Sequence, residues 1–216
     1  MAPKDTDQPS GCETRHGLMR CTNVTLKRCI IGAYTVLPDQ VLGGPAWIDD
    51  DRFLITARSS QPLGDKGLMA MLQTLLADRF KLELHQEFRP GEAMVLAVGR
   101  KKPKLEPSAN APTTWTNMHD HLEAANITMG EFAEILTRNL NLPVVDRTGL
   151  AGTFNFNLRW NPEEADALPR DEARATLRSE VSSEIAKQLG LSLKFQKMPI
   201  KTLIIDHAAK PSEDDN

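Results

Sequence analysis

A pattern that recurs 103 residues further along the chain is the strongest constraint on how this sequence can fold. Asn23-Val-Thr-Leu26 returns as Asn126-Ile-Thr-Met129, and the hydrophobic positions that follow stay in step for some thirty residues. In this alignment Phe53, Ile55 and Ala57 correspond to Phe156, Leu158 and Trp160. The likeness lies in the hydrophobic pattern more than in residue identity. It predicts an internal duplication, which is more typical of a binding scaffold than of a single catalytic centre.

The first unit is expected to span residues 21–100. Thr25 is a typical N-cap, and apolar residues at three-and-four spacing predict a helix that Pro38 ends. Alternating apolar and polar residues around Leu82 predict a half-buried strand, and Arg89-Pro-Gly-Glu92 is expected to turn the chain into a hairpin. The predicted helices and strands, in order, cover residues 25–37, 40–42, 52–57, 67–78, 80–84 and 93–98.

The second unit is expected to span residues 121–210, with residues 101–120 as a linker, 1–20 as an N-terminal segment and 211–216 as a tail. Thr128 and Glu131 form a capping box at a helix start. The predicted elements cover residues 128–139, 143–145, 153–160, 171–189, 191–195 and 200–207. Both units then have the order helix, strand, strand, helix, strand, strand. This order predicts an α+β fold with helices packed on a mixed or antiparallel sheet.

Charge and hydropathy exclude two kinds of partner. The net charge is −3, which gives no electrostatic footprint for nucleic acid. The one basic run, Arg100-Lys-Lys-Pro-Lys104, is interpreted as a solvated linker, with a polyanion site as the alternative. No stretch approaches the ~20 apolar residues that span a bilayer. The oligomeric state cannot be inferred.

The cysteines bear on the compartment. All 3 lie in the first thirty residues, and their spacing fits no zinc site. Cys12 and Cys21 could form a disulfide in an oxidising compartment, whereas Cys29 sits at an apolar helical position and is expected in the core. Residues 1–11 are polar, so the chain is either cytoplasmic or a mature segment from which an export signal has been removed.

Four motifs follow one another in the sequence, at residues 43–53, 71–82, 143–154 and 210–213. Together they resemble a large uncharacterised family, abundant in soil Acidobacteria of the Solibacter type, that carries a "domain of unknown function" label. The resemblance covers roughly residues 20 to 214 and implies a periplasmic or secreted protein, since members usually carry an export signal and are sometimes attached to membrane sensors. Members also open with a short apolar strand, which has no clear copy before Cys21.

The Asn-[Val/Ile]-Thr-[Leu/Met] helix with its following strands also resembles the short N-terminal domain of secretins and TonB-dependent transducers. Such domains bind partner proteins in the periplasm. Neither resemblance implies catalytic residues.

His119-Asp-His121 is the sharpest local candidate for a metal site. Residues two apart on a strand point to one face, so His119 and His121 could hold one metal ion, with Glu123 next on that face. The alternative is an exposed polar end of the linker.

Two further positions are candidate binding residues. Trp47, in a Gly/Pro turn, is either a plug for the core or an exposed binding platform. Asp146 begins Asp-Arg-Thr-Gly, a sequence that commonly forms a turn through side-chain hydrogen bonds. Asp49-Asp-Asp51 lacks the alternation of ligands that calcium loops have.

Two hypotheses follow. The first is an extracytoplasmic module that binds a protein partner or small ligand, without evident catalysis and without a cofactor. The second is a small hydrolase or metal-dependent enzyme that uses the region of His119 and His121 or a cleft between the units. No nucleophile elbow, P-loop or dinucleotide motif occurs in the sequence.

Overall fold

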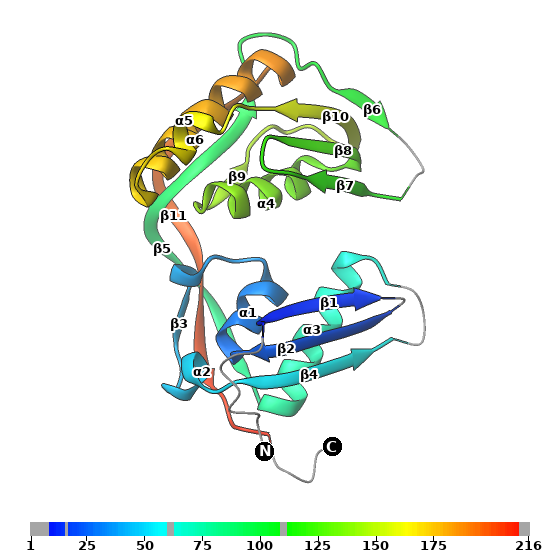
Figure 1. Ribbon diagram of the computed structural model, residues 1–216, viewed down its shortest axis with the longest axis vertical. Helices are drawn as coiled ribbons and strands as arrows, with labels where there is room; N and C mark the ends of the chain where they lie inside the picture. The colour runs from blue at the N-terminus through cyan, green and yellow to red at the C-terminus, as the bar shows by residue number, and fades with distance from the viewer. Residues whose placement is uncertain (1–8, 16, 60–62, 109–111, 212–216) are drawn as a thin grey trace. The chain divides into compact units, whose positions relative to one another are not determined.

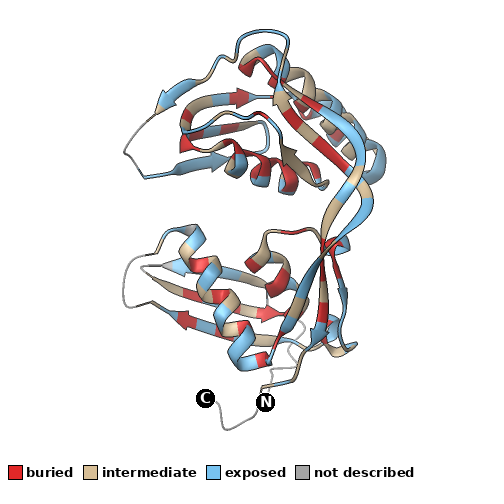
Figure 2. Ribbon diagram, turned by 180° about the vertical axis from the view of Figure 1, so that it is seen from behind, coloured by how far each residue is buried: buried red, intermediate tan, exposed pale blue. Residues whose placement is uncertain are grey.

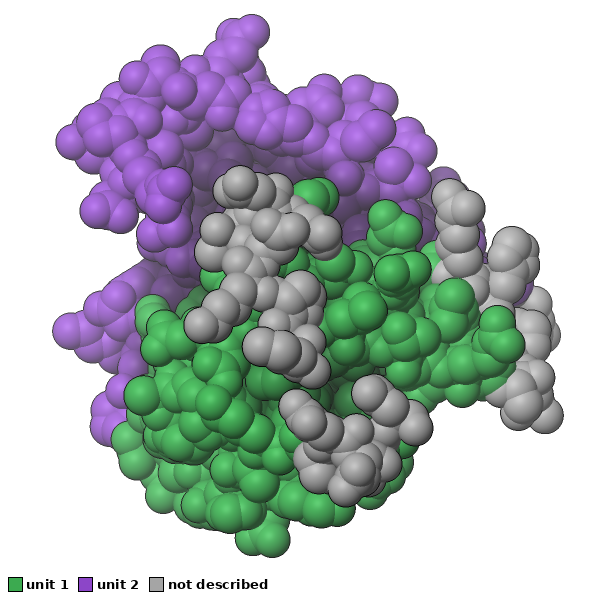
Figure 3. All heavy atoms as spheres, turned by 60° about the horizontal axis from the view of Figure 1, so that its bottom comes forward, with its two compact units in different colours: residues 1–89, 201–216 green, residues 90–200 purple. Residues whose placement is uncertain are grey.

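The computed structural model describes residues 9–15, 17–59, 63–108 and 112–211. It has an α+β fold, which confirms the predicted class (Figure 1). The chain forms two compact units, residues 1–89 with 201–216 (unit 1) and residues 90–200 (unit 2), coloured in Figure 3. The sequence-based boundaries at 21–100 and 121–210 differ from this division, because two long strands contribute residues to both units.

The first half of the chain contains strands β1 (Gly11–Arg15), β2 (Leu18–Val24), β3 (Val41–Gly43), β4 (Phe53–Arg58) and β5 (Glu83–Val98), with helices α1 (Leu26–Tyr34), α2 (Trp47–Asp50) and α3 (Asp65–Phe80). From residue 106 onward the chain contains strands β6 (Glu106–Ser108), β7 (Thr114–Asn117), β8 (His121–Ile127), β9 (Val144–Asp146), β10 (Thr153–Arg159) and β11 (Leu191–His207), with helices α4 (Met129–Leu140), α5 (Glu163–Asp166) and α6 (Arg170–Glu184). A π-helical turn, Ile185–Leu189, follows α6.

Within the described residues the strands form three sheets, in the orders β1-β2-β4, β6-β10-β8-β7 and β3-β11-β5-β9. The pairings in the first two sheets are antiparallel. In the third sheet, β3 pairs with β11 and β9 pairs with β5 in parallel. β6 and β7 lie inside the interval 101–120 that the sequence predicts to be a linker. Both are edge strands, and they are too short to show a periodic pattern in the sequence.

The hairpin predicted at residues 89–92 and the break predicted between the strands at 191–195 and 200–207 are both wrong. β5 and β11 run through these positions as single strands of 16 and 17 residues. Proline can adopt the extended backbone of a strand, so Pro90 and Pro199 need not mark turns. Gly91 leaves room for the side chain of Ile200, because a Cβ atom at position 91 would lie 2.5 Å from Cδ1 of Ile200. This close approach, and not a turn, accounts for the glycine.

The starts of α1 and α4 follow the recurring Asn-x-Thr pattern. Asn23 and Asn126 have positive φ angles of 54° and 57°, a conformation that asparagine tolerates better than most residues. Each lies where the pairing register of β2 or β8 shifts at a bulge. Thr25 accepts a hydrogen bond from the amide of Arg28 at 3.2 Å, and Thr128 forms the expected capping box with Glu131.

Beyond these helices the sequence alignment drifts. Phe53 pairs with Val24, whereas the matching position opposite Ile127 is Phe154. Phe53 and Phe154 are 101 residues apart, so the alignment at 103 is two residues out in this strand. Strand β2 directly precedes α1, although the sequence shows no clear copy of the short apolar strand that the family resemblance implies there.

Each unit has its own hydrophobic core, shown in red in Figure 2. In unit 1 the core joins apolar faces of α1 and α3 to the sheet residues, with Cys29 buried among them as predicted. In unit 2, α4 and α6 pack on β8 and β10, where Phe154, Leu158 and Trp160 are buried and Phe156 packs against the same core. Burial raises the pKa of the Cys29 thiol to about 12.

Cys12 and Cys21 form a disulfide between β1 and β2, where they are direct partners in the strand register. In the described part of the chain, every helix is too short or too polar to cross a lipid bilayer.

Candidate functional site

His119 and His121 lie at the hairpin between β7 and β8, within unit 2. His119 precedes β8 rather than lying on it, and its Nε2 is 2.7 Å from a carboxylate oxygen of Asp166. The Nδ1 of His121 is 2.6 Å from Asp120, and this hydrogen bond lowers the pKa of the Asp120 carboxyl. Glu123 instead accepts a hydrogen bond from Asn157. The two imidazoles therefore contact different carboxylates.

A metal site would need more ligands than this hairpin brings together. Among the residues that the structure describes, no group of three or more His, Cys, Asp or Glu side chains is placed to hold a metal ion. Structural zinc sites take four such ligands. The contacts of His119 and His121 are those of polar side chains that stabilise a hairpin end.

Trp47 lies half-buried in α2 at the edge of the unit 1 core. Its ring stacks on Phe80 with 6.4 Å between the centroids and meets Phe53 edge-on at 6.2 Å. The ammonium group of Lys210 lies 5.7 Å from the ring centroid. These contacts favour the interpretation of Trp47 as a core plug.

Asp146 ends β9 and stabilises the turn that follows. Its carboxylate accepts hydrogen bonds from the amide and the hydroxyl of Thr148, both at 2.8 Å. The Thr148 hydroxyl in turn accepts a hydrogen bond from the amide of Leu150. The residue types that suggested binding are thus used to form an Asx-type turn.

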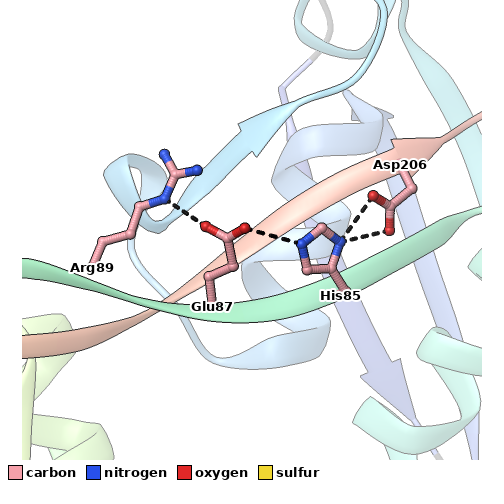
Figure 4. Close-up of polar contacts among 4 residues, drawn as sticks. All are labelled: His85, Glu87, Arg89 and Asp206. Carbon is pink, nitrogen blue, oxygen red and sulfur yellow. Dashed lines mark hydrogen bonds and ion pairs between the residues drawn. The ribbon is translucent and has the colours of Figure 1, made fainter.

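The most organised polar cluster on the surface of unit 1 was not singled out by the sequence. Asp206, His85, Glu87 and Arg89 form a continuous line of contacts, which we call the charged ladder (Figure 4). Both carboxylate oxygens of Asp206 lie within 2.9 Å of His85 Nδ1. Glu87 lies 3.2 Å from His85 Nε2, and Arg89 Nε donates to Glu87 at 2.8 Å.

Strand geometry places these side chains together. Successive residues of a strand point to opposite faces, so His85, Glu87 and Arg89 share one face of β5. Leu84, which directly precedes His85 and points to the opposite face, packs against the unit 1 core. On the neighbouring strand β11, Leu203 and Ile205 are buried, which leaves Asp206 on the outer face beside His85.

The ladder stabilises the imidazolium form of His85. The hydrogen bond to Asp206 raises the pKa of His85, and the bond to Glu87 adds to this effect. The guanidinium of Arg89 lowers the pKa of Glu87, with His85 as the second cause. Only the protonated ring can donate from both nitrogens. With His85 charged, the two cations and two anions of the ladder balance.

This geometry does not match that of a nucleophile with its base. Both ring nitrogens of His85 contact carboxylates, and among the described residues no hydroxyl or thiol is bonded to the ring. Triad-type catalysis needs one nitrogen that faces the nucleophile. The side chains of the ladder are 42% to 49% exposed, so their charges are available to another molecule.

An apolar strip borders the ladder. Leu42 of β3 pairs with Ile204 of β11, and Ile204 shares the outer face with Asp206 because the two are two residues apart. Leu42 is 38% exposed. We call the surface formed by Leu42, Ile204 and the ladder the ladder face.

Sequence reasoning found the alternation around His85 but not the site. The turn expected at residues 89–92 removed Arg89 from the strand, and Asp206 lies 121 residues from His85. The alternation of Glu83, His85, Glu87 and Arg89 with apolar or neutral residues was the available signal.

The fold and this site define an α+β protein with an exposed charged strand surface. A family model described as "Protein of unknown function (DUF3738)" matches residues 27–208. The chain belongs to this uncharacterised domain family. No curated protein and no solved structure matches the chain.

Proposed function

We propose that this protein is a binding module that acts outside the cytoplasm, in the periplasm or after secretion, and recognises a protein partner through the ladder face. The observation that carries the proposal is the charged ladder. Its four side chains are held in place by one another, remain partly exposed and offer no nucleophile.

A pre-ordered charged surface suits recognition. Side chains that already bond to each other lose less conformational freedom when a partner binds. The carboxylates of Glu87 and Asp206 have further lone pairs that can accept hydrogen bonds from a partner. The neighbouring Leu42 and Ile204 add apolar area beside these charges, a combination typical of protein interfaces.

The disulfide supports the proposed location. Disulfides persist in oxidising compartments and are rare in the cytosol. Cys12 and Cys21 are cross-strand partners in β1 and β2, so the bond joins two strands of the unit 1 sheet.

The proposal includes an internal duplication. β2 and β8, the first residues of α1 and α4, and the bounds of β3 and β9 are all separated by 103 residues. Asn23 and Asn126 share the same unusual backbone conformation at the corresponding bulges. The resemblance of this segment to secretin-type domains, which bind partner proteins, also supports a binding role for such a unit.

Site-specific photo-crosslinking tests the proposal. A photoreactive amino acid is placed at Leu42, on the ladder face, in the protein expressed in the cells from which it comes. Leu54 of β4 is the matched control, because it is a leucine of the same unit and is 50% exposed. The expected result is a discrete covalent adduct with one protein from position 42 and none from position 54. Adducts of equal yield from both positions, or from neither, would contradict a partner at the ladder face.

A further inference from the structure

A cavity of about 570 Å³ opens in unit 2 where the end of β5 meets the junction between α6 and β11. Its charged lining residues are all cationic: Arg100, Lys101, Lys187 and Lys194. Among the residues that the structure describes, no carboxylate lines the cavity. This site is separate from the ladder face and does not depend on the function proposed for it.

Three of the four cations are not neutralised. Lys187 forms an ion pair with Glu184 at 2.5 Å. Arg100, Lys101 and Lys194 form no ion pair within the described ranges of the chain. Their charges therefore produce a positive potential at the cavity, which favours an anion.

The helix end beside the cavity would normally repel an anion, because carbonyl groups at a helix C-terminus carry partial negative charge. Here three carbonyls at this end accept hydrogen bonds. The amide of Gly99 donates to Gly190 at 3.1 Å, the amide of Lys104 donates to Leu189 at 2.8 Å, and the Lys104 ammonium donates to the Lys187 carbonyl at 3.0 Å. The repulsive end of the helix is thus largely masked by hydrogen-bond donors.

The same segment fixes the cavity wall. A Cβ atom on Gly99 would lie 2.7 Å from the Gly190 carbonyl oxygen, and one on Gly190 would lie 2.7 Å from that of Lys102. Gly190 also has a positive φ of 68°, which glycine adopts without strain. Backbone packed this closely leaves little freedom to collapse into the cavity.

Apolar groups complete the lining. Val98, Ala186 and Leu191 contribute to it, and Val98 is 41% exposed. We propose that this cavity binds an amphipathic organic anion, with a phosphate, sulfate or carboxylate group at Arg100, Lys101 and Lys194 and an apolar body on Val98 and Leu191.

Nuclear magnetic resonance titration of the full ¹⁵N-labelled chain tests this assignment, with n-octyl phosphate, inorganic phosphate and n-octanol as probes. Octyl phosphate should bind saturably, more tightly than either other probe, and shift the amide signals of Gly99, Lys101 and Ser192. The double variant Arg100→Ala/Lys194→Ala should bind it roughly tenfold or more weakly, because hydrogen bonds to charged groups are lost. Arg170→Ala/Lys197→Ala removes an exposed arginine and lysine elsewhere in unit 2 and should leave binding unchanged.

A third variant separates the two parts of the ligand. Val98→Ser should weaken octyl phosphate binding and leave inorganic phosphate binding unaltered. Equal affinity for octyl phosphate and inorganic phosphate would overturn the amphipathic assignment. Shifts confined to other residues, or binding that the Arg100→Ala/Lys194→Ala protein retains while its spectrum remains that of a folded chain, would overturn the site itself. Binding to anionic lipid vesicles without binding to free octyl phosphate would also overturn it, in favour of a membrane surface site.

Discussion

The imidazole of His85 on β5 is directed at the carboxylate of Asp206 on β11, with both carboxylate oxygens within 2.9 Å of Nδ1. They are 121 residues apart in the sequence. Adjacent strands of one sheet bring them together, and Glu87 and Arg89 continue the line along β5.

This contact predicts a measurable proton affinity. In a nuclear magnetic resonance pH titration, the pKa of His85 should lie above the ordinary histidine value of ~6.5, because Asp206 and Glu87 stabilise the protonated ring. Asp206→Asn should bring the pKa of His85 down toward that value. Asp39→Asn, which removes an exposed carboxylate away from the ladder, should leave the pKa unchanged.

The same shift sets the pH dependence of stability. A group whose pKa is raised on folding stabilises the folded state below its unfolded pKa, and the effect is lost as the pH rises through the folded value. Wild type should therefore exceed Asp206→Asn in melting temperature most clearly at about pH 5 to 6. A difference that grows at alkaline pH would show that His85 is not the cause.

Trp160 should be among the costliest residues to truncate. It is 9% exposed, and its indole Nε1 donates to the carbonyl of His119 at 2.9 Å. Trp160→Ala should lower the free energy of unfolding by ~3–5 kcal/mol, measured by denaturant titration. Trp115, which is 38% exposed, provides the control, since its truncation removes much less buried area. An unchanged midpoint for Trp160→Ala would refute its role in the core.

The disulfide should stabilise unit 1. Reduction, or the Cys12→Ser/Cys21→Ser variant, should cost about 2–4 kcal/mol, seen as a lower melting temperature. Cys29 provides an internal control, because burial holds its thiol protonated and the thiolate is the reactive form. The native oxidised protein should show no rapid reaction with a thiol reagent. Rapid labelling of one thiol per chain would show that Cys29 is accessible.

The hairpin at His119 and His121 should not form a zinc site. Each imidazole contacts its own carboxylate, Asp166 or Asp120, and two histidines alone do not complete a structural site. Calorimetric titration with Zn²⁺ should give the same weak signal for wild type and His121→Ala, and both should have similar melting temperatures. Stoichiometric binding that His121→Ala abolishes would favour the metal-dependent enzyme.

Local sequence rules predicted much of the fold. The caps at Thr25 and Thr128 and the apolar spacing of α1 depend on neighbouring residues, which the sequence shows directly. The turn predictions near residues 90 and 198 failed because the strands there depend on contacts with distant residues. Pro90 and Gly91 continue a strand that lies beside β11 in the sheet, and β11 is about a hundred residues away in the sequence.

These local rules could not predict the candidate site. His85 lies on the polar side of a strand that the alternation identifies, but its importance comes from Asp206, and no local pattern pairs the two. Trp47 and Asp146 stood out because of their residue types and their turns. Their contacts in the structure serve packing and turn formation.

The dependence of crosslinking on His85 tests the central claim most directly. The photoreactive residue is placed at position 42 in three proteins: one with the ladder intact, one with His85→Ala and one with Lys197→Ala. Their adduct yields are compared at equal protein levels. Recognition through the ladder face predicts that His85→Ala loses most of the adduct and that Lys197→Ala retains it. An adduct that forms equally well without the His85 side chain would contradict recognition through the ladder.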